Sequence, residues 1–183
     1  MAREYTRRVV VRIKKAADGA ILAVARPDGV TTWQRSRMGG FFALHDLTHL
    51  VVESVLGFDD AFFGLLAKGW DIRTFEDKSD PRYADIPARA ILTEHIVGIL
   101  LGRATDPTRP NDARHDSELR LAWADEINAE LAMCLAKDKL APFTITPETL
   151  NLIIEKLEPL HTSWMSLPVG AALELTFPLG EPA

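Results

Sequence analysis

The spacing of the apolar residues changes near residue 40, and this change limits the folds that the chain can adopt. Before it, Val9, Val11 and Ile13 fall on one face of an extended chain and basic residues fall on the other, which is the period of a half-buried β-strand. After it, residues 41–56 contain no Gly or Pro, and their apolar positions follow the period of a helix. The chain therefore begins with sheet and continues with helices that must cover it.

The same two periods, with the turn residues between them, predict the other elements. Strands are expected over residues 8–14, 21–26 and 30–34, and a fourth strand around Leu173, Leu175 and Phe177. Helices are expected over residues 41–56, 60–68, 87–103, 117–137 and 147–164, with Asp59 capping the second and Thr146 the fifth. Residues 105–112 have the composition of an exposed loop.

These elements predict an α+β fold, in which a small antiparallel sheet of three N-terminal strands and one C-terminal strand packs on about five helices. No change of composition marks a domain boundary, and an apolar content of 47% can build a sizeable core. We therefore expect a single domain over residues 1–183.

The charge and the cysteine content limit the classes of partner. Lys and Arg total 21 against 26 Asp and Glu, and a formal net charge of −5 does not suit nucleic-acid binding. Cys134 is the single cysteine, so no intramolecular disulfide can form. No apolar run approaches the roughly 18 residues of a membrane span, and the first residues do not resemble a signal peptide. We expect a soluble, cytoplasmic protein that binds neither nucleic acid nor a membrane.

Two histidines lie four residues apart in the predicted helix 41–56. His45 and His49 are therefore one turn apart on the same helix face, where both imidazoles can reach one ion. An acid, Asp46, directly follows the first of them. The segment His45-Asp46-Leu47-Thr48-His49 resembles the His-Glu-x-x-His motif of the zincin metallohydrolases, with aspartate in place of glutamate.

The resemblance implies a role for each of three residues. It implies that His45 and His49 hold the metal and that Asp46 takes a proton from metal-bound water. Aspartate is one methylene shorter than glutamate, which retracts the carboxylate by about 1.5 Å. A displacement of this size can lower a catalytic rate about 100-fold.

A third ligand is expected on the predicted helix 87–103. Glu94 stands there among apolar residues, in a helix expected to have no solvent-facing side, and an uncompensated buried carboxylate is unfavourable. In the gluzincin branch of the zincins the third ligand is a glutamate on a later helix, which the resemblance transfers to Glu94. Gly98, one turn further along, would let another helix approach closely. His95 is the competing ligand.

Glu53 continues the four-residue spacing of the histidines, but it lies too far along the helix to reach the same ion. A metal between the two histidines lies near the level of residue 47, and Glu53 is about 9 Å further along the axis. Glu53 therefore either accepts the free ring N–H of His49 or is a solvated surface acid.

Two functions fit these residues. The first is a metal-dependent hydrolase of peptidase or amidase type, with zinc, or else nickel or iron, on His45, His49 and Glu94, with Asp46 as base, and with a peptide or small-molecule substrate. The second is a non-catalytic protein, either a binding module with a structural metal or an interaction protein without a metal. In a protein without a metal, the histidines are ordinary polar residues. A structural site is closed by four protein ligands, which His95 or Glu53 would complete, whereas a catalytic site keeps one position open.

Overall fold

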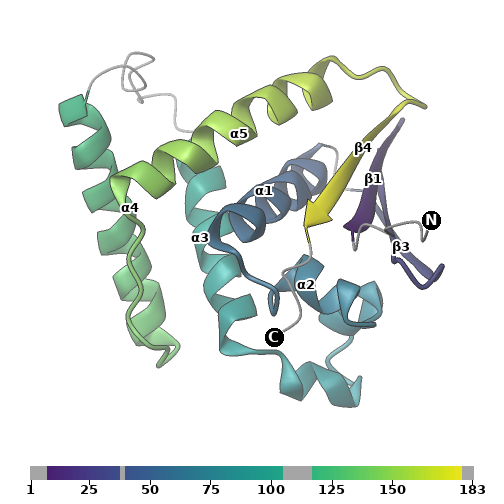
Figure 1. Ribbon diagram of the computed structural model, residues 1–183, viewed down its shortest axis with the longest axis horizontal. Coiled ribbons are helices and arrows are strands. Elements are labelled where there is room, and N and C mark those ends of the chain that lie inside the picture. Colours follow the sequence, from purple (N-terminus) through teal and green to yellow (C-terminus); the bar gives the residue numbers. More distant parts are fainter. Residues whose placement is uncertain (1–7, 38–39, 105–116, 179–183) are drawn as a thin grey trace, which may run out of the picture.

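The computed structural model describes residues 8–37, 40–104 and 117–178 (Figure 1). The predicted loop over residues 105–112 lies outside these ranges. Within them, four strands form one antiparallel sheet and five α-helices lie beside it, which confirms the predicted α+β fold.

The sheet joins the two ends of the described chain. Its strands lie in the order β3-β2-β1-β4, and they are β1 (Arg8–Ala16), β2 (Gly19–Ala25), β3 (Thr31–Ser36) and β4 (Ala172–Pro178). Val11 of β1 lies opposite Val24 on one side and Leu175 on the other. Val9, Val11 and Ile13 are fully buried, so the alternation of β1 directs one face of the strand into the core.

The helices follow the third strand. They are α1 (Phe41–Leu56), α2 (Phe62–Ala67), α3 (Ala88–Ala104), α4 (Ser117–Lys137) and α5 (Pro147–Ser166). Two short 3-10 helices that the apolar spacing does not predict, η1 (Ile72–Phe75) and η2 (Pro81–Asp85), connect α2 to α3. The bounds of α1 match the prediction, and Gly57 ends it in the left-handed conformation. In the described part of the chain, no helix combines the length and the apolar content that crossing a membrane requires.

Helix α1 occupies the centre of the fold, between the sheet and the other long helices (Figure 1). Leu47 packs with the buried face of the sheet, while Val51 and Val52 belong to the cluster that α1 forms with α3, α4 and α5. Because α1 is covered on both sides, it also buries three polar residues, Thr48, His49 and Glu53.

Helix α3 has a solvent-facing side, so the expectation that it has none is wrong. Ile91, Glu94 and Gly98 follow one another at helical spacing, and all three are exposed. The reason is that α3 packs against α1 and α4, which cover only part of its circumference. A Cβ at Gly98 would meet no atom within 4 Å. The expected close approach of another helix at this glycine is therefore also wrong.

Asp59 does not cap α2, contrary to the prediction. The helix begins at Phe62, with Ala61 as a cap that offers no side-chain hydrogen bond. The side chain of Asp59 instead accepts from Lys68 Nζ at 3.0 Å. Its backbone packs so closely on Gly64 that a Cβ there would lie 2.3 Å from the Asp59 carbonyl oxygen.

Substitutions at two glycines test this description of α2 and α3. Gly98→Ala should raise the free energy of unfolding by about 0.5–1 kcal/mol, because alanine favours the helix and its Cβ meets open space. Gly64→Ala should lower it by about 1–3 kcal/mol, because its Cβ collides with the Asp59 backbone. Urea unfolding followed by circular dichroism measures both. A Gly98→Ala protein as destabilised as Gly64→Ala would contradict the exposed position of Gly98.

Candidate metal centre

Three side chains from two helices meet where α1 packs on α3. His45 and His49 come from α1, and their ring centroids lie 4.6 Å apart. Glu94 of α3 faces both rings, with Oε2 3.3 Å from His45 Nε2 and Oε1 3.3 Å from His49 Nε2. One ligand atom from each residue lies within 4.8 Å of the others. His45, His49 and Glu94 therefore form a group that could hold a metal ion.

The Nε2 atom of His49 is the least satisfied atom of this group. His49 is 2% exposed, and among the described residues its Nε2 atom has no hydrogen-bond partner. The nearest carboxylate oxygen, Glu94 Oε1, lies 3.3 Å away without the direction of a hydrogen bond. A buried polar atom without a partner is uncommon in native proteins. A cation between the two rings and Glu94 would satisfy it.

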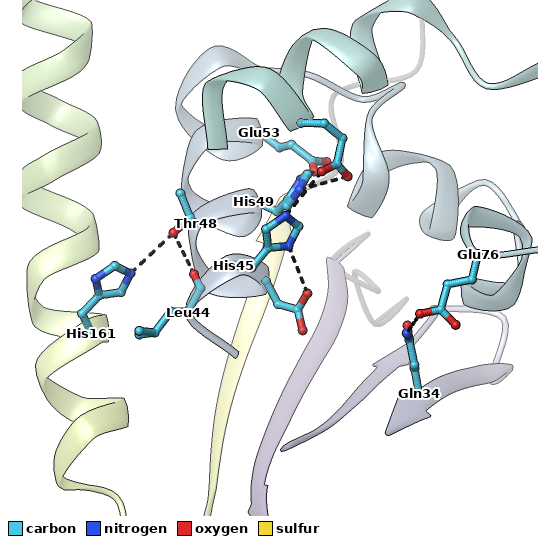
Figure 2. Close-up of polar contacts among 10 residues, drawn as sticks. Gln34, Leu44, His45, Thr48, His49, Glu53, Glu76 and His161 are labelled. Carbon is cyan, nitrogen blue, oxygen red and sulfur yellow. Dashed lines mark hydrogen bonds and ion pairs between the residues drawn. The ribbon is translucent and has the colours of Figure 1, made fainter. Parts of the chain in front are cut away.

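The other ring nitrogen of His49 is held by Glu53. His49 Nδ1 lies 3.1 Å from Glu53 Oε1, and both residues are buried (Figure 2). Because an ionised carboxylate only accepts, Nδ1 would carry the proton when the ring is neutral, and the lone pair of Nε2 would then face Glu94. This arrangement is typical of histidines that bind metals. It confirms Glu53 as the partner of the His49 ring and excludes a solvated surface acid.

Glu53 also binds the start of α2. Its Oε2 accepts from the backbone N–H of Phe63 at 2.9 Å, and the N–H of Gly64 lies 3.4 Å away. These two amides and the His49 ring give a buried carboxylate the partners that it needs. Glu53 thus fixes the orientation of the His49 ring and is itself held by the backbone N–H groups of Phe63 and Gly64.

The charges of the site favour a cation between the rings and Glu94. Burial lowers the pKa of His49, but Glu53 and Glu94 raise it further, to about 10. Burial also lowers the pKa of His45, and the carboxylates of Asp46 and Glu94 bring it above its usual value. Burial raises the pKa of Glu94, and the two imidazoles lower it well below its usual range. In the metal-free site the carboxylates therefore stabilise protonated imidazoles, and a divalent ion would supply the positive charge in place of these protons.

Glu94 was predicted from a burial that it does not have. Its side chain is 55% exposed, although both of its carboxylate oxygens face imidazoles. The sequence reasoning therefore named the residue that joins the two histidines, but for a wrong physical reason. Because Glu94 lies on the exposed side of α3, the part of the site that it forms is close to solvent.

Two other histidines do not join the group. His95 is the next residue on α3, and its Nε2 lies 2.8 Å from Asp138 Oδ2. His161 of α5 lies with Nε2 3.5 Å from Thr48 Oγ1, away from the rings of His45 and His49 (Figure 2). The structure therefore does not bring the competing ligand His95 to the candidate centre.

Asp46 lies at the other ring nitrogen of His45. Its Oδ1 is 3.8 Å from His45 Nδ1, whereas Glu94 lies at Nε2. Burial raises the pKa of Asp46, and the neighbouring His45 only partly opposes this shift. Asp46 is therefore a more basic carboxylate than an exposed aspartate.

A cavity of about 160 Å³ adjoins this group. His45, Asp46 and Glu94 line it on the side of the helices, and Phe42, Phe62 and Phe75 contribute aromatic walls. The remaining wall comes from β2, β3 and the residue after η1, and it consists of Ala20, Leu22, Gln34, Ser36 and Glu76. The candidate centre thus opens into a small space of mixed polarity.

The sequence reasoning missed Gln34 and Glu76. Gln34 Nε2 donates to Glu76 Oε1, and the two residues are separated by 42 positions in the chain. Neither belongs to a motif, and no local pattern links β3 to η1. The four-residue spacing from His49 is the sequence signal that pointed to Glu53. No sequence signal predicted the hydrogen bonds of Glu53 to the backbone of α2.

Comparison with family models, with curated proteins and with solved structures finds no match for this chain. The chemistry of the site therefore carries the functional assignment.

Glu53→Gln tests the support of His49. Glutamine has the same size, but it has one acceptor oxygen in place of two and cannot accept from both the His49 ring and Phe63 N–H. We expect the metal-free protein to lose about 1–3 kcal/mol of stability. We also expect zinc affinity to fall about 10- to 100-fold. Chemical denaturation and zinc titration measure the two effects.

Glu155→Gln is the control, because Glu155 is an exposed glutamate on α5. It should change neither quantity. Wild-type zinc affinity in Glu53→Gln would show that this carboxylate does not support the site.

Proposed function

We propose that the protein is a metal-dependent hydrolase of peptidase or amidase type, in which His45, His49 and Glu94 hold zinc. The observation that carries this proposal is the buried Nε2 of His49, which has no hydrogen-bond partner among the described residues and lies beside Glu94. Two imidazoles and one carboxylate suit zinc, nickel or iron better than calcium or magnesium.

The number of ligands supports a catalytic site over a structural one. His95 pairs with Asp138, and Glu53 is used by the far nitrogen of His49, so neither completes a set of four. The cavity that His45 and Glu94 line offers room for a substrate beside the ion that they would hold. Three protein ligands and an open position are typical of catalytic zinc.

In the proposed reaction Asp46 would be the general base, acting through the cavity that it shares with His45 and Glu94, because it lies at Nδ1 of His45 and not at Nε2. Zinc held by His45, His49 and Glu94 would act as a Lewis acid that polarises a substrate carbonyl and lowers the pKa of water. Asp46 lines the same cavity, and burial raises its pKa toward the range in which a carboxylate accepts a proton efficiently. The water oxygen bonds to the carbonyl carbon, Asp46 takes the proton, and the proton passes to the leaving nitrogen as the C–N bond breaks.

Metal binding is the first test. Wild-type protein should bind about one equivalent of zinc and melt at a higher temperature when it is bound. His45→Ala and His49→Ala should abolish binding, and Glu94→Gln should weaken it about tenfold or more. His95→Gln is the control, because His95 contacts Asp138 and lies outside the group. Isothermal titration calorimetry and thermal melting give the two readouts, and a wild-type protein that binds no zinc would end the proposal.

Variants of Asp46 separate catalysis from structural metal binding. Asp46→Asn should keep zinc but lower the hydrolysis of p-nitrophenyl acetate by about 100-fold or more, because it removes the base. Asp46→Glu keeps a carboxylate and extends it by one methylene, so it should retain hydrolysis well above Asp46→Asn. Equal rates in wild type and Asp46→Asn would exclude Asp46 as the base. A zinc-loaded wild type that hydrolyses neither this ester nor a panel of peptide amides would favour a structural metal.

A further inference from the structure

The cavity beside the candidate metal centre is also lined by a hydrogen-bonded polar pair. Gln34 of β3 donates from Nε2 to Glu76 Oε1, and Figure 2 shows this pair well separated from His45. Among the residues that the structure describes, none donates a hydrogen bond to Glu76 Oε2. Glu76 is exposed, so this carboxylate oxygen is open to solvent and to a molecule in the cavity that it lines.

The described charged residues of the cavity wall include three acids and neither lysine nor arginine. The acids are Asp46, Glu76 and Glu94. Arg35 follows Gln34 in β3, but the alternation of the strand turns it to the opposite face, where it binds Asp18 at 2.7 Å. A bound divalent ion would bring two positive charges to these three carboxylates and leave a net charge of −1. In the metal-free cavity a substrate carboxylate or phosphate would meet these three acids, and His45 is the one described residue of the wall that can carry a positive charge.

The apolar walls suit an ammonium group as well. Phe62 and Phe75 lie with their ring centroids 4.9 Å apart, and both line the cavity together with Phe42. Aromatic faces attract cations, while their area also takes up the hydrocarbon part of an amine. A volume of about 160 Å³ is below that of the pockets that hold drug-sized ligands. The cavity therefore fits one short side chain or a small molecule.

We infer that the substrate is a small amide or ester with a protonated amine, which Glu76 binds while the carbonyl group lies at His45, Asp46 and Glu94. This inference rests on the proposed hydrolase for the position of the carbonyl group. The amine preference of the metal-free cavity can be measured without the metal. Glu76 is the residue that sets this preference.

The test has a metal-free arm and a zinc arm. In the first, n-butylammonium, 1-butanol and butyrate are titrated against metal-free protein, with the side-chain amide signal of Gln34 followed by NMR. In the second, zinc-loaded protein is titrated by calorimetry with β-alanine hydroxamate, butyrohydroxamate and succinic monohydroxamate, which differ in one terminal group. In both arms the cationic member should bind about tenfold or more tighter than the neutral one, and the anionic member should bind most weakly.

Glu76→Gln should lower the affinity of the cationic member relative to the neutral one about tenfold in both arms. It should change neither the zinc affinity nor the binding of the neutral member. Asp77→Asn is the matched control, because it removes one charge from the adjacent exposed residue, which does not line the cavity. Thermal melting of both variants verifies that they fold.

The outcomes separate this inference from the proposed function. An amine preference in metal-free protein that binds no zinc would support the cavity assignment and end the hydrolase proposal. Equal binding of the three ligands, a preference for the anion, or an unchanged preference in Glu76→Gln would overturn the inference. Zinc binding would then still stand on its own test.

Discussion

The buried carboxylate of Glu53 is the interaction on which the arrangement of the site depends. Helix α1 is covered by the sheet on one side and by helices on the other. A charged side chain on its buried face must therefore find its partners inside the protein. Glu53 finds them in the His49 ring and in the backbone of α2. The carboxylate therefore fixes the position of α2 and the direction of the His49 imidazole together.

The group extends from a buried residue to an exposed one. His49 is almost completely enclosed, whereas Glu94 lies on the solvent-facing side of α3. Two of the three side chains come from one continuous helix, whose rigidity fixes their spacing, and the third comes from a helix packed against it. Such a site combines a fixed orientation of the buried ring with an opening on the opposite side.

The sequence predicted the elements of this fold better than it predicted their surroundings. The strands and α1 were found because their apolar periods are strong and their ends carry turn or capping residues. The His45–His49 pair was found because helical spacing fixes it. The exposure of Glu94 was predicted wrongly, because an apolar helix that touches neighbours on only part of its surface has the same composition as one that is enclosed. Gln34 and Glu76 meet through tertiary structure alone.

The pairing of β1 with β4 has a consequence for how the protein is made. Arg8 lies opposite Pro178, so β1, one of the two inner strands of the sheet, completes its pairing with β4 only after the ribosome has passed residue 178. Until then one edge of β1 is unpaired, and Phe177 cannot cover its share of the apolar face. Contacts between such distant segments slow folding, because a long loop must close before they form. The nascent chain therefore carries an edge open to aggregation or chaperones while α1 and α3 can already meet.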